Sequence, residues 1–312
     1  MSLSRTDIVL LIMCSLFSLA VIVLAITAGI QNNNQNMENF TNKKICVIIT
    51  GFAPRSLKYT HKSITTEIIE PLQKSFRVVD IFHYSLASKS GKIESNRDGE
   101  NGLSIDNNNI YLLKTNKTIS EYQEDINLPT IQCLQKENHK VNPLRQFYYE
   151  KKAVNSFPIG KYDACVMITS DSYFLTPINI KHVHNICNTS RPKIYTTSFN
   201  QSSGIANGFY IAKPNILKKL CSRGDLYSER CKKLKLDKQT ENPEIFLKWV
   251  FRYYKFVNTF TPMFYIKIRA TKKSNGYFKY MSDYKIKKNK LDTMLSLGIT
   301  YPQESKEKKS SL

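Results

Sequence analysis

An acidic residue between two serines follows a strongly apolar segment of this 312-residue chain. Residues 162–169 (YDACVMIT) predict a buried β-strand, and Ser170, Asp171 and Ser172 come directly after it. Open α/β sheets place their ligand sites at the carboxyl ends of strands. One carboxylate and two hydroxyls could hold a divalent cation there, because hard cations prefer oxygen ligands and bridge to phosphates. Asp171 could equally cap the next turn or helix, and the triplet alone does not decide between the two.

The segments that must position this triplet predict one α/β domain. Residues 45–50 (ICVIIT) predict a strand buried on both faces, residues 60–72 a helix and residues 76–84 a second strand. Strand, helix and strand in this order indicate a βαβ unit at the start of a mostly parallel sheet.

The rest of the chain continues the alternation of strands and helices. We expect further strands at residues 110–113, 193–197, 208–212 and 254–260, and helices at residues 143–156 and 244–253. Residues 85–109 are polar and predict a long flexible insertion. The domain is expected to cover residues 45–284, with residues 285–312 as a lysine-rich flexible tail.

The charge of the chain is high and unevenly placed. The sequence has 46 Lys and Arg against 25 Asp and Glu, a formal net charge of +21. From residue 213 onward, 24 basic residues face 9 acidic ones. Such a charge suits a nucleic-acid partner, but no RNA-binding, zinc-finger or helix-turn-helix signature is present. We therefore expect no nucleic-acid partner, and assign the surplus to anionic lipid headgroups or acidic glycans.

Residues 8–30 contain no charged side chain and predict a transmembrane helix. At about 1.5 Å per residue they can cross a hydrocarbon layer of about 30 Å. The apolar core of a cleaved signal peptide is shorter, about 7–15 residues. Arg5 precedes the segment, and residues 31–41 carry no Lys or Arg, so the positive-inside rule leaves residues 1–7 in the cytosol. We predict a type II signal-anchor with residues 31–44 as a polar stem and the domain in the ER or Golgi lumen.

In an oxidising lumen, cysteines could form disulfides and sequons could be N-glycosylated. Cys46 and Cys165 lie in apolar runs and are expected to be small core residues, whereas Cys221 and Cys231 form the first candidate disulfide. The sequons begin at Asn39, Asn116, Asn188 and Asn200, a number that chance alone explains.

Several blocks follow one another in a defined order over residues 45 to about 270: ICVIITGFAPRS, VVDIFHYSL, RQFYYEKKAV, YDACVMITSDSYFLTPINI, NGFYIAKPNIL and ENPEIFLKWVF. Their order resembles a glycosyltransferase of the GT-A type, especially the membrane-anchored ones of large DNA viruses. The resemblance implies a single GT-A-like domain, that is, a Rossmann-like α/β domain with a mixed, mostly parallel sheet. It also implies a nucleotide-sugar donor.

On the donor side, the resemblance implicates the turn after the first strand and the helix at residues 143–156. Gly51 would let the backbone approach the base, and Arg55 could pair with the diphosphate, unless this is an ordinary turn with a surface arginine. Arg145, Tyr149 and Lys152 share one helix face and could clamp the diphosphate, or could form a solvated basic stripe.

Asp171 occupies the place of the family's Asp-x-Asp motif, with Ser170 and Ser172 as its neighbours at the donor. The first acid is replaced by Ser170 or Thr169, and a late histidine that often completes the metal site is missing. His182 and His184 could chelate, but alternation on a loop or strand explains them as well. These departures argue against strict dependence on Mn²⁺ or Mg²⁺, and Arg and Lys could neutralise the leaving phosphate instead.

On the acceptor side, the resemblance points to Asn207 and Gly208, which could bind and admit a sugar hydroxyl. A type I′ hairpin turn explains Asn-Gly as well. Glu244, or less favourably Glu241, could deprotonate the acceptor hydroxyl in an inverting transfer, and both could simply cap a helix.

Two functions follow from these residues. The first is a type II membrane glycosyltransferase acting on a glycan, glycoprotein or glycolipid acceptor. The alternative is a non-catalytic membrane-anchored binding or structural protein on a degenerate glycosyltransferase fold, which the exchange of an acid for Ser170 favours.

Overall fold

The computed structural model describes residues 18–22, 24, 42–94, 99–128, 141–198, 204–233, 242–272, 274–275 and 288–299. By its contacts the chain divides into Met1–Lys43 and Lys44–Leu312. In the first unit, residues 18–22 and 24 are helical. Among the described residues no helix is both long and apolar enough to cross a membrane. Most of the predicted anchor, residues 8–30, lies outside the described residues, so this prediction is untested.

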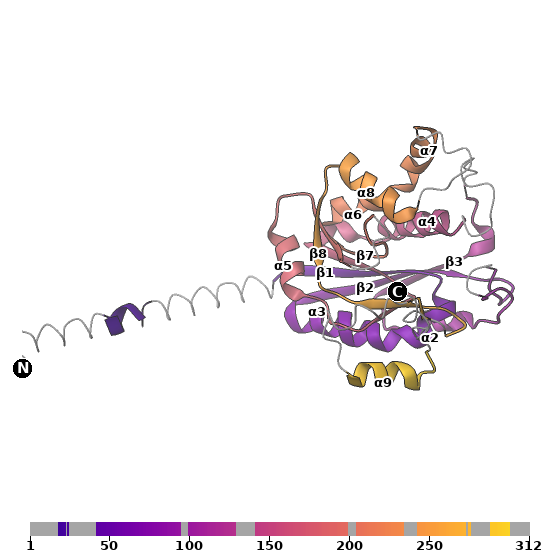
Figure 1. The fold of residues 1–312 in the computed structure, drawn as a ribbon, viewed down its shortest axis with the longest axis horizontal. Helices are drawn as coiled ribbons and strands as arrows, with labels where there is room; N and C mark the ends of the chain where they lie inside the picture. The colour runs from indigo at the N-terminus through magenta and orange to yellow at the C-terminus, as the bar shows by residue number, and fades with distance from the viewer. Residues whose placement is uncertain are drawn as a thin grey trace, which may run out of the picture. The chain divides into compact units, whose positions relative to one another are not determined.

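The second unit is built on a seven-stranded sheet, which confirms the expected mixed, mostly parallel α/β architecture (Figure 1). Pairing is parallel except at β7, which runs antiparallel to both of its neighbours. In spatial order the strands are β3 (Lys117–Tyr122), β2 (Val78–Ala87), β1 (Lys44–Gly51), β4 (Ala164–Thr169), β7 (Phe209–Ala212), β6 (Lys193–Thr197) and β8 (Val257–Thr261).

A second, three-stranded sheet has the order β10 (Ser274–Asn275), β9 (Tyr265–Ile268) and β5 (Ser172–Phe174). β5 begins three residues after β4 ends, so only Ser170 and Asp171 separate the two sheets along the chain. β5 pairs antiparallel with β9, and this pairing places Ser172 opposite Lys267. None of these three strands was expected from the sequence.

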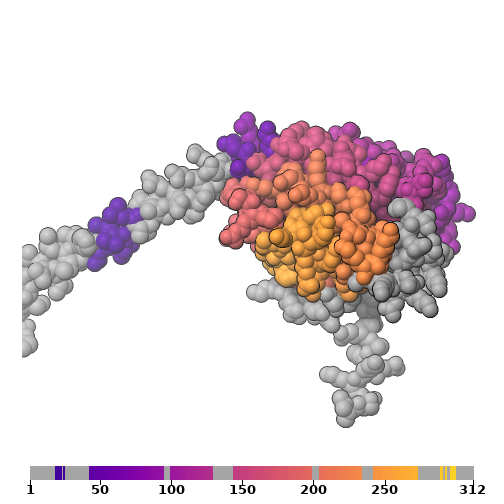
Figure 2. Space-filling view, turned by 90° about the horizontal axis from the view of Figure 1, so that it is seen from above, coloured from indigo at the N-terminus to yellow at the C-terminus, as the bar shows by residue number. Residues whose placement is uncertain are grey.

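Helices cover both sides of the larger sheet. Figure 1 shows α2 (Ala53–Ile64) and α3 (Glu70–Ser75) on one side and α4 (Val141–Ser156), α6 (Pro214–Cys221) and α8 (Pro243–Tyr253) on the other. The central strands β1 and β4 are buried on both faces, as their unbroken apolar runs predicted. α4 and α8 pack against each other through Phe147 and Phe246, whose ring centroids are 5.6 Å apart. Figure 2 shows the orange segments around α8 beside the pink middle of the chain.

The helix after β1 is longer than predicted and contains one π turn. It begins at Ala53, with Pro54 in its first turn, and a π-helical segment, Thr65–Ile69, joins α2 to α3. Pro71 has no N–H for the Glu67 carbonyl four residues earlier. That carbonyl instead accepts a 2.8 Å hydrogen bond from the Ile178 N–H. The π turn therefore ties this helix to the segment after β5.

Two sequence predictions for the region after β2 are wrong. Residues 110–113 are not a strand: Asp106 accepts a hydrogen bond from the Asn108 N–H, which starts the 3₁₀ helix Asn107–Tyr111. The polar segment at residues 85–109 is not a loose insertion where it is described. It contains an antiparallel bridge between Lys92 and Ser104, and Glu100 is completely buried.

The C-terminal part also differs from the expected tail. Lys288–Ser296 form helix α9, and its Lys290 makes a 2.6 Å ion pair with Glu67. Ile299 just beyond α9 is completely buried. A buried isoleucine within a lysine-rich sequence, together with the ion pair of Lys290, therefore holds residues 288–299 on the domain.

Cysteine pairing was predicted in part correctly. Cys46 and Cys165 are core residues, opposite each other on β1 and β4, with sulfur atoms 3.1 Å apart. The expected Cys221–Cys231 disulfide is wrong, because Cys221 is a free thiol buried against Met167. Cys231 on α7 (Gly224–Lys233) is disulfide-bonded.

Candidate functional site

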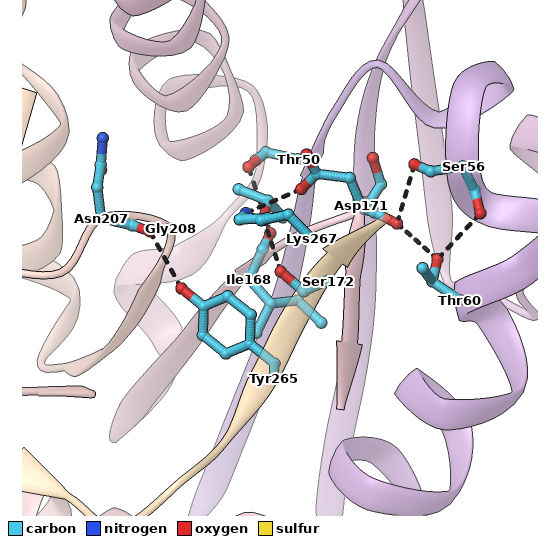
Figure 3. A network of polar contacts seen from close by, with 12 residues as sticks. Thr50, Ser56, Thr60, Ile168, Asp171, Ser172, Asn207, Gly208, Tyr265 and Lys267 are labelled. Atoms are coloured by element: carbon cyan, nitrogen blue, oxygen red, sulfur yellow. Dashed lines mark hydrogen bonds and ion pairs between the residues drawn. The ribbon is translucent and has the colours of Figure 1, made fainter. Parts of the chain in front are cut away.

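Asp171 lies at the carboxyl end of β4 (Figure 3), and three elements hold the backbone of Ser170 and Asp171. The Ser170 N–H donates to the Thr50 carbonyl at the end of β1, at 2.8 Å. The Ser170 carbonyl accepts a 2.6 Å hydrogen bond from the Thr60 hydroxyl on α2. The Asp171 carbonyl accepts from the Ile268 N–H on β9, at 2.8 Å. These bonds fix the direction of the Asp171 side chain without using its carboxylate.

The Asp171 carboxylate is surrounded by three cations. Its Oδ1 lies 2.8 Å from Lys267 Nζ, and its Oδ2 lies 2.8 Å from Arg55 Nη2 and 3.0 Å from Arg269 Nη1. Burial alone would raise the pKa of Asp171, but Lys267, Arg55 and Arg269 outweigh burial and hold that pKa well below its usual range. Asp171 is therefore a carboxylate at any physiological pH.

Lys267 joins this cluster to the ends of β4 and β5. Its ammonium also donates to the Thr169 hydroxyl, which shares a 2.9 Å hydrogen bond with the Ser172 hydroxyl. Burial lowers the pKa of Lys267, the Asp171 carboxylate raises it, and the charges of Arg269 and Arg55 lower it further. The site thus holds several positive charges close together, and the position of each depends on Asp171.

Arg55 reaches the cluster from the first turn of α2. Gly51, just before it, has a φ of +125°, and a Cβ there would stand 3.0 Å from the Ser170 hydroxyl oxygen. Glycine is therefore required where β1 passes β4. Arg55 also lies 3.6 Å from the buried carboxylate of Glu100, which accepts a hydrogen bond from the Ala270 N–H. The alternative of a surface arginine in an ordinary turn is wrong.

Asn207 and Gly208 lie beside the cation cluster. Gly208 has a φ of +97°, and a Cβ there would be 3.1 Å from Lys267 Nζ, so glycine lets the ammonium approach. The Asn207 carbonyl accepts a 3.1 Å hydrogen bond from the Tyr265 hydroxyl (Figure 3). The position of this Asn-Gly pair before β7 is therefore set by β9 contacts.

The Asn207 side chain is held by a buried network on its other side. Its Oδ1 accepts hydrogen bonds from Gln146 at 2.8 Å, from the Tyr210 hydroxyl at 2.5 Å and from Arg223 at 3.2 Å. Arg223 in turn makes a 2.5 Å ion pair with Glu150, and each of these two side chains is only 1% exposed. Asn207 is thus a fixed polar group.

Glu244 stands at the first turn of α8, close to the same site. Asn242 caps this helix through the Glu244 N–H, and the Glu244 carbonyl accepts from the Ile205 N–H at 2.9 Å. Burial raises the pKa of Tyr265, and the charges of Asp171 and, more weakly, Glu244 raise it further. Both carboxylates therefore disfavour ionisation of the Tyr265 hydroxyl. Glu241 lies outside the described residues.

The predicted clamp on α4 is not formed as one unit. Lys152 is exposed and lies 3.8 Å from Glu121, on the Tyr148 ring. Burial lowers the pKa of Arg145, and the carboxylates of Glu94 and Glu124 oppose that shift.

Of the three residues on the predicted face of α4, only Tyr149 has a pKa on which charges of the Asp171 cluster act. Burial raises its pKa first, followed by the charges of Glu150 and Asp171, while Arg55 and Arg223 oppose the shift. The predicted face thus divides, because Lys152 lies beside Glu121 and the carboxylates that act on the pKa of Arg145 are those of Glu94 and Glu124.

The described residues do not fit a divalent cation well. The part of the chain that the structure describes contains no cluster of three or more His, Cys, Asp or Glu. Asp171 is the acid at the predicted position, and both of its oxygens already contact Lys or Arg. His182 and His184 lie on helix α5 (Ile180–Asn188), not on a loop or strand. There His182 bonds Thr261, and its ring stacks on Tyr195.

Sequence reasoning missed the contribution of β9. Tyr265, Lys267 and Arg269 alternate with Ile266 and Ile268, and this period of two is typical of a strand that sends its polar side chains to one side. The pattern was available as a signal, but it spans only five residues.

Comparison with known proteins adds no relative: no family model matches the chain, and no curated protein matches it.

Proposed function

We propose that this chain is a membrane-anchored glycosyltransferase of the GT-A type, which moves a sugar from a nucleotide-sugar donor to a glycan, protein or lipid acceptor. One observation carries the proposal. Arg55 and Lys267 meet at the Asp171 carboxylate, and the Asn207 carbonyl lies beside them on the Tyr265 hydroxyl, at the carboxyl ends of β1 and β4. The charge of Glu244, at the first turn of α8, raises the pKa of that hydroxyl. Ligand sites of open α/β sheets form at this edge, and cations beside a fixed amide and a carboxylate suit an anionic donor with a hydroxyl acceptor.

The chemistry assigned to these residues is a direct displacement. The acceptor oxygen forms a bond to the anomeric carbon of the donor while the bond from that carbon to the diphosphate oxygen breaks. The electron pair of the broken bond stays on the diphosphate, beside Arg55 and Lys267. The proton of the acceptor hydroxyl passes to Glu244, whose position at the start of α8 is set by Asn242.

The proposed location is the lumen of the ER or Golgi, with residues 8–30 as a type II signal-anchor. The disulfide at Cys231 supports an oxidising compartment. A protease-protection assay on sealed microsomes tests this: the domain is expected to resist protease until detergent is added.

A non-catalytic protein on the same fold is the second candidate. The observation that favours it is the occupation of Asp171 by three cations, because a buried ion cluster can serve stability alone. Such a protein could still bind a nucleotide-sugar without transferring the sugar.

Incubation of the purified chain with a panel of nucleotide-sugars, with and without Mn²⁺ or Mg²⁺, separates the two candidates. The glycosyltransferase releases nucleoside diphosphate when an acceptor is present. Glu244→Gln should lower kcat by about 10²–10⁴ because it removes the base. The matched control is Glu229→Gln on α7, an exposed carboxylate paired with Lys233, which should leave kcat unchanged. Thermal stabilisation by a donor without any release would support the non-catalytic candidate, and the absence of both responses would reject glycosyl transfer.

A further inference from the structure

The divalent cation implied by the GT-A resemblance does not fit the residues at Asp171. A metal ion there would have to displace Lys267 from Oδ1, or Arg55 and Arg269 from Oδ2. The residue before Asp171 is a serine, so a second acid is not adjacent on that side. Cations placed this close to a carboxylate also repel a divalent ion.

We propose that Arg55, Lys267 and Arg269 take over the role of this metal ion, so that the chain binds the diphosphate of its donor without a divalent cation. This inference rests on the proposed glycosyl transfer. Asp171 then acts as a positioning residue: it gathers three mutually repelling cations, and it is not a metal ligand.

The charge balance of the cluster is suited to an anion. Among the residues that the structure describes, the three cations of the cluster face two buried carboxylates, Asp171 and Glu100. Burial first, and then the charges of Arg269 and Arg55, lower the pKa of Lys267, so a positive charge is costly at this position. A bound diphosphate would relieve that cost.

The exposure of the three cations assigns them different tasks. Arg55 and Lys267 each keep 17% of their side chain exposed, whereas Arg269 keeps 6%. Arg55 and Lys267 are therefore the two that an incoming phosphate can touch, and Arg269 supports Asp171 from the interior. Arg and Lys differ in a useful way here, because guanidinium binds two oxygens at once and ammonium acts as a compact charge.

Two polar groups beside the cluster point to a ligand independently. Arg55 Nε and the Ser170 hydroxyl are both buried and have no hydrogen-bond partner among the residues that the structure describes. Ser170 itself is 1% exposed, and its hydroxyl stands next to Gly51. Buried polar groups are normally paired, so exceptions at a cation cluster suggest a partner such as a phosphate oxygen.

Calorimetric titration of the purified full chain with uridine diphosphate and guanosine diphosphate tests the inference, once in EDTA and once in Mn²⁺ or Mg²⁺. We expect one of these probes to bind in EDTA with an affinity that the metal leaves unchanged within about threefold. Lys267→Met should weaken that binding by about 10- to 100-fold, because it removes a charge-assisted contact. The matched control, Lys219→Met on the exposed side of α6, should bind as the unaltered chain does.

The outcomes separate the inference from the proposed function. Binding only in the presence of Mn²⁺ or Mg²⁺ would overturn the inference and leave glycosyl transfer standing. The inference would also be overturned if Lys267→Met and Arg55→Gln each bound the diphosphate in EDTA as tightly as the unaltered chain does. If neither probe nor any nucleotide-sugar binds under either condition, the proposed function fails and the inference fails with it. Should Lys267→Met not fold, Lys267→Arg and the metal dependence of the unaltered chain decide the question.

Discussion

The buried ion pair between Glu150 and Arg223 allows a sharp test of how the Asn207 side of the site is held. Glu150→Met leaves the Arg223 guanidinium with the Leu220 carbonyl and Asn207 Oδ1, both at 3.2 Å. A charge that loses its partner inside a protein costs about 3–5 kcal/mol. Because each side chain is only 1% exposed, solvent cannot supply the missing compensation. We expect Glu150→Met to lower the free energy of unfolding by that amount, and Arg223→Met to lower it similarly.

The double variant Glu150→Met/Arg223→Met should behave quite differently from the sum of the two. Replacing a buried ion pair by apolar side chains of similar volume is often neutral or stabilising. We therefore expect its free energy of unfolding to lie within about 2 kcal/mol of that of the unaltered chain. The coupling would show that Glu150 and Arg223 act as one unit.

Urea unfolding followed by linear extrapolation measures the free energy of unfolding of the unaltered chain, the two single variants and the double variant. The exposed pair of Lys233 and Glu229, at 2.6 Å on α7, is the matched control. Glu229→Ala should cost less than about 1 kcal/mol because solvent screens that pair. Additive losses in the double variant, or a loss below about 1 kcal/mol for Glu150→Met, would refute the reasoning.

Three further predictions address the core, the glycine at the site and the disulfide. Burial lowers the pKa of His83 from 6.5 to about 4. The unfolded chain therefore takes up a proton as the pH falls below 6.5 while the folded chain does not, so stability should drop by about 3 kcal/mol between pH 6.5 and 4. His83→Gln should flatten this dependence in urea titrations at several pH values. Gly51→Ala should lower the free energy of unfolding by about 1–3 kcal/mol because of its φ of +125°, whereas Gly160→Ala, with open space and no positive φ, should change it by less than about 0.5 kcal/mol. Cys231→Ser should cost about 2–4 kcal/mol and make the melting temperature insensitive to reductant, and an unchanged melting temperature would argue against the disulfide.

Much of the fold was predictable because local pattern and burial agree. The unbroken, β-branched apolar runs of β1 and β4 favoured strands buried on both faces, and these two strands and β6 were placed within two residues of their observed bounds. The helix α4 was likewise expected, from the proline near its first turn. The segment at residues 110–113 misled because four apolar residues fit a strand or a short helix equally well, and the Asp106 cap decided for the 3₁₀ helix.

The sequence by itself determined that Asp171 follows a buried strand and that Gly51 and Arg55 follow another. Parallel neighbours end at the same edge of a sheet, so these residues had to come close once β1 and β4 paired. Only the tertiary structure decided what Asp171 contacts. Lys267 and Arg269 lie 96 and 98 residues further along the chain, on a three-stranded sheet whose pairing depends on backbone hydrogen bonds. The alternation of β9 can indicate a strand, but it does not say which strand β9 pairs with. For that reason the sequence suggested a metal ligand where the structure places an anion held by three cations.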